Sequence, residues 1–239
     1  MHGYFFDKAG DERMEKQNVY NWLALIQLIQ NAALEKDPEG RSALPINKGK
    51  AWDILDIGCH TGGFLALFEQ ETDPSVINPA GVEPLFDARE KTEQRFLRGN
   101  FFHEIGQVPN QSADLVVSHE TLYLVSDLTG WINELKRILR PDGGAFISLG
   151  SHGENTAWLR WRKQLEKKYG HISYPYQPMD ILEVGENAGF DMELHRLHPK
   201  PQTSLRFSPP EDGWGEFLSA KEALDFQQQK YVFVFYPKR

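Results

Sequence analysis

The chain has 239 residues, 40% of them hydrophobic and 25% charged, with a formal net charge of -8 at pH 7. This composition is typical of a globular protein, whereas nonspecific nucleic-acid binding depends on Lys and Arg contacts with phosphates and is disfavoured by an acidic chain. The single cysteine, Cys59, excludes an internal disulfide bond and favours a reducing, cytoplasmic setting.

The N-terminal part predicts neither a secretory signal nor a membrane span. The segment MHGYFFDKAGDERM becomes charged after six residues, which is not typical of a signal peptide. The longest apolar run, WLALIQLIQNAAL, is too short and too rich in amides to cross a bilayer. We therefore expect a soluble cytoplasmic protein.

Residues 1–50 are expected to form a helical cap. Between about residues 16 and 35 apolar side chains recur at helical spacing, which predicts an amphipathic helix. The apolar face consists of Val19, Trp22, Leu23, Ile26, Ile29 and Ala33. The following stretch, EKDPEGRSALPINKGK, collects Pro, Gly and charge and indicates a linker.

Strands and helices alternate over residues 51–150, the expected cofactor-binding core. The expected strands are WDILDIG, NPAGVE, ADLVVSH and AFISLG. The expected helices are GGFLALFEQ, LFDAREKTEQRFL and LTGWINELKRILR, and PDGG is expected to be a turn. Leu128, Trp131, Leu135 and Ile138 share one face of the third helix. This alternation favours a mostly parallel sheet covered on both faces.

The remaining residues complete a predicted single domain over 1–239. An insertion at 151–177 contains the helix NTAWLRWRKQLEKKYG, and residues 178–239 contribute further helices and strands. These are the helix YQPMDILEVGENAGF, the strand MELHRL, a Pro-rich stretch and the helix EFLSAKEALDFQQQ. The last run, YVFVFY, is apolar on both faces, which predicts an interior strand.

The segment DILDIGCHTGGFL contains the strongest functional signal. In open α/β sheets ligands bind beyond the carboxyl ends of the strands, and the first strand-to-helix turn needs glycine for close backbone approach. Gly58, Gly62 and Gly63 meet this need. Glu83 comes at the end of the second expected strand, where an acid can accept hydrogen bonds from ribose hydroxyls. A nicotinamide-binding loop would read G-x-G-x-x-G, and GCHTGG does not.

Residues 50 to 197 resemble the class I S-adenosylmethionine-dependent methyltransferases. The motif-I strand and loop of that family run acid, apolar, Gly, any, Gly, any, Gly, and residues 56–62 follow this pattern except at His60. GVEP resembles the second-strand acid, and RGNFF resembles the third-strand segment that contacts adenine. ADLVVSHETLYLVSD and LRPDGGAFISLG resemble the fourth-strand and fifth-strand segments. YQPMDILEVGENAGFDMEL resembles the helix and strand that close many small-molecule members.

The resemblance implies a Rossmann-like, doubly wound, mostly parallel seven-stranded α/β sheet with a helical cap and insertion. YVFVFY would be its seventh strand, inserted and antiparallel. The implied cofactor is S-adenosylmethionine, with S-adenosylhomocysteine as product and a small molecule as methyl acceptor. The implied cofactor-binding residues are Asp56, Gly58, Cys59, His60, Gly62, Glu83, Asn100, Phe101 and Ser118.

Several of these residues also have a purely structural interpretation. His60 stands at a glycine position, and His is among the non-glycine residues that tolerate a positive φ, so its ring could simply be turned aside. Alternatively, the ring contacts the methionine portion of the cofactor or gates the substrate. Cys59 is consistent with small filler, Glu83 with a surface acid, and Phe101 with core packing.

The candidate catalytic residues are His119 and Glu120, which follow the fourth strand. Methyl transfer depends on proximity and orientation, and a base is needed only if the accepting atom has a proton to lose. The ordinary pKa of histidine suits His119 for this role, although the residue could instead cap a helix or line the cofactor edge. Glu120 could bind a substrate amine, and His152 after the fifth strand is a further candidate base.

Neither metal nor nucleic acid is expected as a partner. The chain has no H-x-x-x-H pair or His–carboxylate cluster at ligand spacing. WLRWRKQLEKKYG interleaves aromatic and basic residues, as in single-strand binders. However, Trp158, Trp161, Leu165 and Tyr169 share one helical face, which favours a packed helix with a solvated basic face.

The N-terminal helix and the insertion are expected to flank the same edge of the sheet. They would bring Tyr4, Phe5, Trp158, Tyr174 and Tyr176 there, either as lid residues that exclude water or as ordinary core. Two rival functions stay open. One is intramolecular cyclisation of the cofactor with release of methylthioadenosine, and the other is non-catalytic cofactor binding. The oligomeric state is not predicted.

Overall fold

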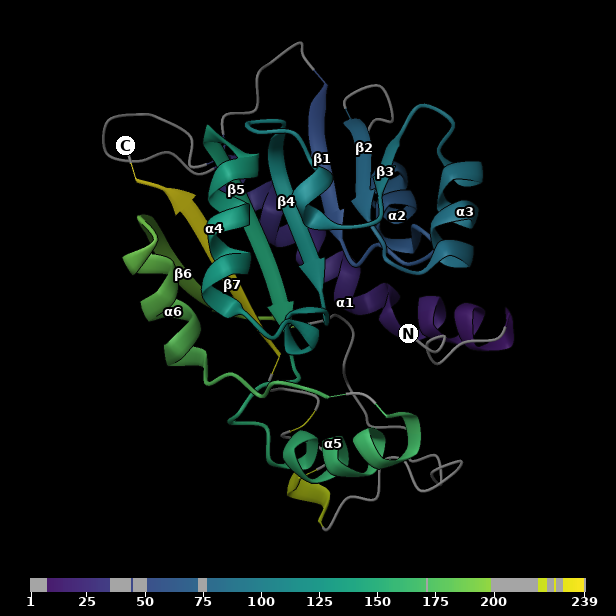
Figure 1. Cartoon of the computed structure of the whole chain (residues 1–239), viewed down its shortest axis with the longest axis vertical. Coiled ribbons are helices and arrows are strands. Elements are labelled where there is room, and N and C mark those ends of the chain that lie inside the picture. Colours follow the sequence, from purple (N-terminus) through teal and green to yellow (C-terminus); the bar gives the residue numbers. More distant parts are fainter. Residues whose placement is uncertain are drawn as a thin grey trace.

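One seven-stranded sheet organises the chain (Figure 1). The computed structural model describes residues 8–34, 44, 51–72, 77–170, 172–198, 219–222, 226 and 230–238. The strand order is β3-β2-β1-β4-β5-β7-β6. The strands are β1 (Trp52–Ile57), β2 (Ile77–Val82), β3 (Asn100–Phe102), β4 (Ala113–His119), β5 (Leu139–Leu149), β6 (Phe190–Arg196) and β7 (Tyr231–Pro237).

The direction of the strands confirms the predicted doubly wound fold. The strands β3, β2, β1, β4 and β5 are parallel to their neighbours, whereas β7 runs antiparallel between β5 and β6. The order reverses between β1 and β4, and such a switch point is where open α/β sheets bind ligands. The predicted antiparallel, inserted position of the YVFVFY strand is also confirmed.

Helices cover both faces of this sheet (Figure 1). They are α1 (Lys8–Leu34), α2 (Gly63–Glu71), α3 (Phe86–Arg95), α4 (Leu128–Ile138), α5 (Thr156–Tyr169) and α6 (Pro178–Asn187). Buried side chains of α1 and α2 form one core with one face of the strands, and those of α4 and Ile181 of α6 form a second core with the other face.

The last strand contributes to both cores. Successive side chains of a strand point to opposite faces. Val232 and Val234 therefore belong to the core under α1 and α2, whereas Phe233 and Phe235 belong to the core under α4 and α6. This double burial explains why the YVFVFY segment is apolar at every position.

Some element boundaries differ from the expectation. The helix α4 ends at Ile138, and β5 begins at Leu139 and runs through the expected PDGG turn. Pro141 explains the early end, because the residue before a proline is restricted away from helical geometry. The helix α1 begins at Lys8 rather than near residue 16. The helix expected in EFLSAKEALDFQQQ, the linker and Tyr4 and Phe5 lie largely or wholly outside the described residues.

The helix α5 lies beyond the carboxyl ends of β4 and β5 in Figure 1. Asn155 caps its N-terminus by accepting a hydrogen bond from the Trp158 backbone N–H at 3.2 Å. Trp158 and Trp161 are buried, and Arg160 forms an ion pair with Glu222 at 2.8 Å. These contacts agree with a packed helix, while the side chains of residues 165 and 169 lie outside the described part.

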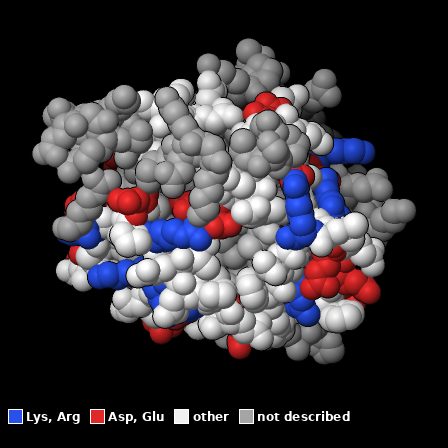
Figure 2. All heavy atoms as spheres, turned by 90° about the horizontal axis from the view of Figure 1, so that it is seen from above, with Lys and Arg blue, Asp and Glu red and all other residues white. Residues whose placement is uncertain are grey.

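The opposite end of the molecule, where the parallel strands begin, is shown in Figure 2. Acidic and basic side chains are interspersed there, and no continuous basic surface for phosphates is visible in that view. None of the described helices is both long enough and apolar enough to cross a bilayer.

Candidate cofactor and acceptor site

The loop after β1 is held in an unusual backbone conformation. Gly58, His60 and Gly62 have φ angles of 81°, 47° and 76°. A side chain at Gly58 would collide with Thr121, so both φ and packing require glycine there. The Gly58 and Cys59 N–H groups donate to the Val82 carbonyl at 2.8 and 3.2 Å, which fixes the loop against the end of β2.

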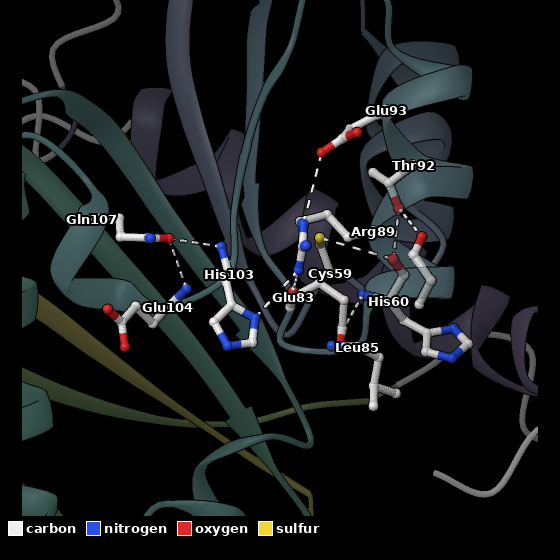
Figure 3. Close-up of polar contacts among 11 residues, drawn as sticks. Cys59, His60, Glu83, Leu85, Arg89, Thr92, Glu93, His103, Glu104 and Gln107 are labelled. Atoms are coloured by element: carbon white, nitrogen blue, oxygen red, sulfur yellow. Dashed lines mark hydrogen bonds and ion pairs between the residues drawn. The ribbon is translucent and has the colours of Figure 1, made fainter. Parts of the chain in front are cut away.

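Both backbone groups of His60 are held by side chains (Figure 3). Its N–H donates to Glu83 Oε2 at 3.0 Å, and its carbonyl accepts from Thr92 Oγ1 at 2.6 Å. The His60 ring points away from Glu83 in this view. The residue thus occupies the glycine position with a positive φ and a ring turned aside from Glu83, as its structural interpretation requires.

Glu83 is buried at the carboxyl end of β2, beside the loop. Besides His60, the Leu85 N–H donates to its Oε1 at 2.9 Å. Burial raises the pKa of Glu83, and the hydrogen bonds from Leu85 and His60 act in the opposite direction. A carboxylate offers about four lone-pair sites, so two backbone donors do not exhaust its capacity to bind hydroxyl groups. The surface-acid interpretation does not fit this burial.

Asp56 at the end of β1 and Cys59 in the loop are also buried. Burial raises the pKa of Asp56 to about 8, and the charge of Glu83 contributes in the same direction. Burial together with Asp56 and Glu83 raises the pKa of the Cys59 thiol. The thiol lies against Gly81, where a Cβ would collide with it, which agrees with the interpretation of Cys59 as small filler.

Asn100 and Phe101, the predicted adenine contacts on β3, do not lie at the carboxyl end of that strand. Asn100 is exposed and pairs with Ala80, two positions before β3 ends, and the Phe101 ring packs against Phe96 at 6.0 Å between centroids. The carboxyl end of β3 is Phe102, whose carbonyl accepts from the Glu83 N–H at 2.9 Å.

His103 therefore lies level with Glu83, and it is not among the residues predicted from the sequence. Its Nδ1 lies 3.4 Å from Nη1 of Arg89, which donates to the Glu83 carbonyl at 2.7 Å. Gln107 Oε1 accepts from the backbone N–H groups of His103 and Glu104 at 2.9 and 3.3 Å (Figure 3). The carboxyl ends of parallel strands meet at one edge, so aligning the strand ends would have pointed to His103.

Ser118 faces the interior instead of the site. It is fully buried, and its hydroxyl donates to the Ile57 carbonyl at 2.9 Å. This bond joins the ends of β4 and β1, so the side chain is used within the sheet. The expected cofactor contact of Ser118 is not supported by this geometry.

His119 has both ring nitrogens engaged. Nδ1 lies 2.6 Å from Ser148 Oγ, and Nε2 lies 3.2 Å from Asn18 Oδ1. Because Asn18 Oδ1 can only accept, the network assigns the hydrogen to Nε2 and leaves Nδ1 to accept from Ser148. Burial lowers the pKa of His119 to about 3, and Lys230 adds to this effect. These surroundings argue against the predicted role of His119 as base.

Glu120 is bound on both oxygens. Oε1 accepts from the Gly150 N–H at 2.8 Å and from Lys230 Nζ at 2.5 Å, and Oε2 accepts from Ser151 Oγ at 2.8 Å. Burial alone would raise the pKa of Glu120, but the charge of Lys230, the neighbouring His119 and the hydrogen bonds from Lys230 and Ser151 lower it to about 2. A substrate amine would therefore have to displace Lys230, so the predicted amine site is not supported.

The other aromatic and imidazole groups at this end are also packed. The His152 ring is buried and stacks on Tyr231 at 4.7 Å, and its Nδ1 accepts from the Glu154 N–H at 3.3 Å. The Trp158 ring packs edge-on against Tyr123 at 4.9 Å.

Tyr174 and Tyr176 stack at 6.3 Å, and Tyr176 donates to the Val125 carbonyl at 2.7 Å. Ordinary packing thus accounts for these expected lid residues. Among the described residues, no group of His, Cys, Asp and Glu side chains has the arrangement of a metal site.

Residues 15–195 match the family described as methyltransferase domain. The chain belongs to this family. A malonyl-[acyl-carrier protein] O-methyltransferase of Paenibacillus sp. is 32% identical over 149 residues, which cover 57% of this chain and 51% of that protein. The chain thus spans about half the length of this curated relative.

Solved structures agree on the fold of this methyltransferase domain. A chain of the complex between the Haloferax volcanii Trm112 methyltransferase activator and a methyltransferase superposes with a TM-score of 0.72 at 15% identity, covering 97% of this chain and 95% of that one. Phosphoethanolamine N-methyltransferase 2 of Haemonchus contortus, in complex with S-adenosylmethionine, gives 0.61 at 14% identity, with 91% and 53% covered. The predicted family and its cofactor, S-adenosylmethionine, are confirmed at this level.

The residues of the loop and of β2 suit that cofactor chemically. Glu83 offers carboxylate oxygens at the switch point for ribose hydroxyls, and the glycines permit close backbone approach.

Proposed function

We propose that this methyltransferase domain transfers the methyl group of S-adenosylmethionine to a small-molecule acceptor. The observation that carries the proposal is the meeting of the glycine loop and Glu83 at the switch point of the sheet. When bound, the cofactor supplies an electrophilic methyl group on sulfur. The protein then contributes mainly by binding and orienting the two reactants.

The loop after β1, Glu83 and the residue after β3 each have a proposed role in binding the cofactor. Gly58 and Gly62 let the backbone approach the cofactor, Glu83 accepts hydrogen bonds from the ribose, and the buried Asp56 forms the end of β1 beneath the loop. His103, just after β3, takes the adenine-side position that was predicted for Asn100. His60 keeps the loop conformation and makes no direct contact with the cofactor.

The methyl acceptor is proposed to bind beyond the carboxyl ends of β4 and β5, next to the residues that follow these strands. The Paenibacillus relative is named as an O-methyltransferase of a malonyl group on acyl carrier protein, which supports oxygen as the accepting atom. The packed, ion-paired surface of α5 does not favour a nucleic-acid acceptor. The buried thiol of Cys59 suits a reducing compartment, and the cytoplasm stays the proposed location.

Calorimetric titration with S-adenosylhomocysteine tests the cofactor site. We expect Glu83→Gln to weaken binding about tenfold, or about 1.4 kcal/mol. The amide replaces one of the two carboxylate oxygens that accept hydrogen bonds from the ribose hydroxyls. Glu90→Gln, at an exposed position on α3, is the control and should bind normally. Equal affinity of both variants and the unchanged protein would contradict the assigned site.

Product analysis tests the reaction itself. Incubation with S-adenosylmethionine and acceptors should yield S-adenosylhomocysteine. Methylthioadenosine would instead indicate cyclisation, and binding without turnover on any acceptor would indicate a non-catalytic module.

A further inference from the structure

The two imidazoles that the sequence offered as bases on the acceptor side have their acceptor nitrogens engaged, and the predicted amine ligand Glu120 is already bound on both oxygens. Nδ1 of His119 accepts from Ser148, and Nδ1 of His152 accepts from the Glu154 N–H. In each neutral ring the hydrogen then sits on Nε2, so the ring has no second acceptor nitrogen. Glu120 accepts from three donors on its two oxygens. None of these groups is arranged to take a proton from an acceptor.

Lys230 brings a positive charge to the same end of the sheet. Leu149 of β5 pairs with Tyr231 of β7, so Lys230 lies beside the residues that follow β5. The Lys230 side chain is 15% exposed, so solvent reaches part of it. An ammonium group has three N–H donors, and Glu120 accepts from one of them. The same ammonium can therefore also hold an anion at the site.

We propose that the methyl acceptor is a carboxylate, which binds beside Lys230 and is methylated on oxygen without a catalytic base. This inference rests on the proposed methyl transfer and names the chemical class of its acceptor. A carboxylate is ionised at neutral pH, so its oxygen has no proton to lose. A lone pair of that oxygen forms the new O–CH3 bond while the S–CH3 bond breaks. The electron pair of the broken bond stays on sulfur in S-adenosylhomocysteine.

The charge of Glu120 is compatible with an anionic acceptor. Three donors from Gly150, Ser151 and Lys230 surround the Glu120 carboxylate, so its charge is balanced locally. A phenol or an ammonium acceptor would have to lose a proton before attack, and the groups described above do not provide for that step. The arrangement therefore favours an acceptor that arrives already deprotonated.

Transfer of labelled methyl from S-adenosylmethionine tests the acceptor class. The probes are malonyl-coenzyme A as carboxylate, catechol as phenol and histamine as amine. We expect label only in a base-labile methyl ester of malonyl-coenzyme A, with kcat/KM nearly constant between about pH 6 and pH 9. Label in catechol or histamine, or a rate that rises about tenfold per pH unit, would overturn the inference.

Nitrogen NMR of the imidazole rings gives a readout that does not depend on the probe. In the full chain saturated with S-adenosylhomocysteine, His119 should stay neutral with the hydrogen on Nε2 across the same pH range. Titration of the His119 ring in this range would overturn the inference. If no S-adenosylhomocysteine forms with any acceptor, the proposed function is wrong. The NMR measurement would still show whether His119 can act as a base in this pH range.

A charge-matched variant tests the role of Lys230. Removing Lys230 alone leaves Glu120 unpaired and risks misfolding, so the double variant Lys230→Gln with Glu120→Gln is used. We expect KM for malonyl-coenzyme A to rise about tenfold or more, with affinity for S-adenosylhomocysteine unchanged. Lys238→Gln, just beyond the other end of β7, is the control. An unchanged KM in the double variant would overturn the assignment of Lys230.

Discussion

At the scale of single residues, His60 stands where the family's loop pattern has glycine, and yet the loop keeps the backbone conformation that a glycine would adopt. Its φ of 47° lies in the left-handed region that normally favours glycine, and Glu83 and Thr92 hold its backbone on either side. Such a conformation costs a non-glycine residue about 1–2 kcal/mol. The two anchoring side chains offset this cost.

Replacement of His60 distinguishes this account from a direct role in binding. His60→Gly should change the free energy of unfolding by no more than about 1 kcal/mol, because relief of strain offsets the added chain entropy. Affinity for S-adenosylhomocysteine, measured by calorimetry, should be unchanged. His60→Val should destabilise the protein, since a β-branched residue tolerates positive φ poorly. Loss of affinity in His60→Gly alone would show that the ring contacts the cofactor.

Asp56 makes stability depend on pH. The unfolded Asp56 ionises near its ordinary pKa of 3.8, whereas the folded residue keeps its proton to about pH 8. The folded state thus binds more protons between these values, and its stability falls as pH rises, by at most about 1.4 kcal/mol per pH unit. Asp56→Asn should remove this slope in chemical denaturation without cofactor. Asp87→Asn, at an exposed position on α3, should retain it.

At the scale of elements, α3 fixes the cofactor loop through Thr92. This buried hydroxyl bonds the His60 carbonyl and also lies 3.1 Å from the Ala88 carbonyl of its own helix. The loop therefore depends on a helix that follows the next strand, and not only on its own glycines.

Thr92→Val should show this dependence. The His60 carbonyl would lose its hydroxyl donor, which should lower the free energy of unfolding by about 1–3 kcal/mol. Affinity for S-adenosylhomocysteine should fall with it, because the loop is less well held. Thr129→Val, an exposed position on α4, should change stability by no more than about 0.5 kcal/mol. Equal behaviour of the two variants would contradict the role of Thr92.

At the scale of the whole molecule, α1 joins the two halves of the site. Glu15 on α1 accepts from Thr61 Oγ1 of the cofactor loop at 3.1 Å, and Asn18 one turn later contacts His119 of β4. The same helix buries Leu25, Ile26 and Ile29 in the core. Cofactor binding should therefore stabilise the fold as a whole.

Thermal or chemical unfolding with cofactor product measures this linkage. At about 100 times the dissociation constant, S-adenosylhomocysteine should add about 2.7 kcal/mol to the free energy of unfolding. Glu83→Ala should lose most of this gain, since the ribose acceptor is gone. Glu90→Ala is the matched control on α3. A gain of the same size in Glu83→Ala would place the ligand elsewhere.

Most strands of the sheet, and the loop and acid at its ligand-binding end, could be predicted from the sequence. The alternation of strand and helix segments predicted a mostly parallel sheet, the doubly apolar YVFVFY run predicted an interior strand, and the glycine loop with Glu83 indicated the ligand-binding end of the sheet. These signals are local, because periodicity and turn chemistry depend on near neighbours in the chain.

Only the tertiary structure decided which polar groups near the site are still able to react. His119 is an apparent base in the sequence, but Asn18 of α1 and Ser148 of β5 occupy its ring nitrogens. Glu120 looks open to an amine until Lys230, from the far end of the chain, pairs with it. Proton affinity depends on burial and on partners distant in sequence, and no local pattern encodes them.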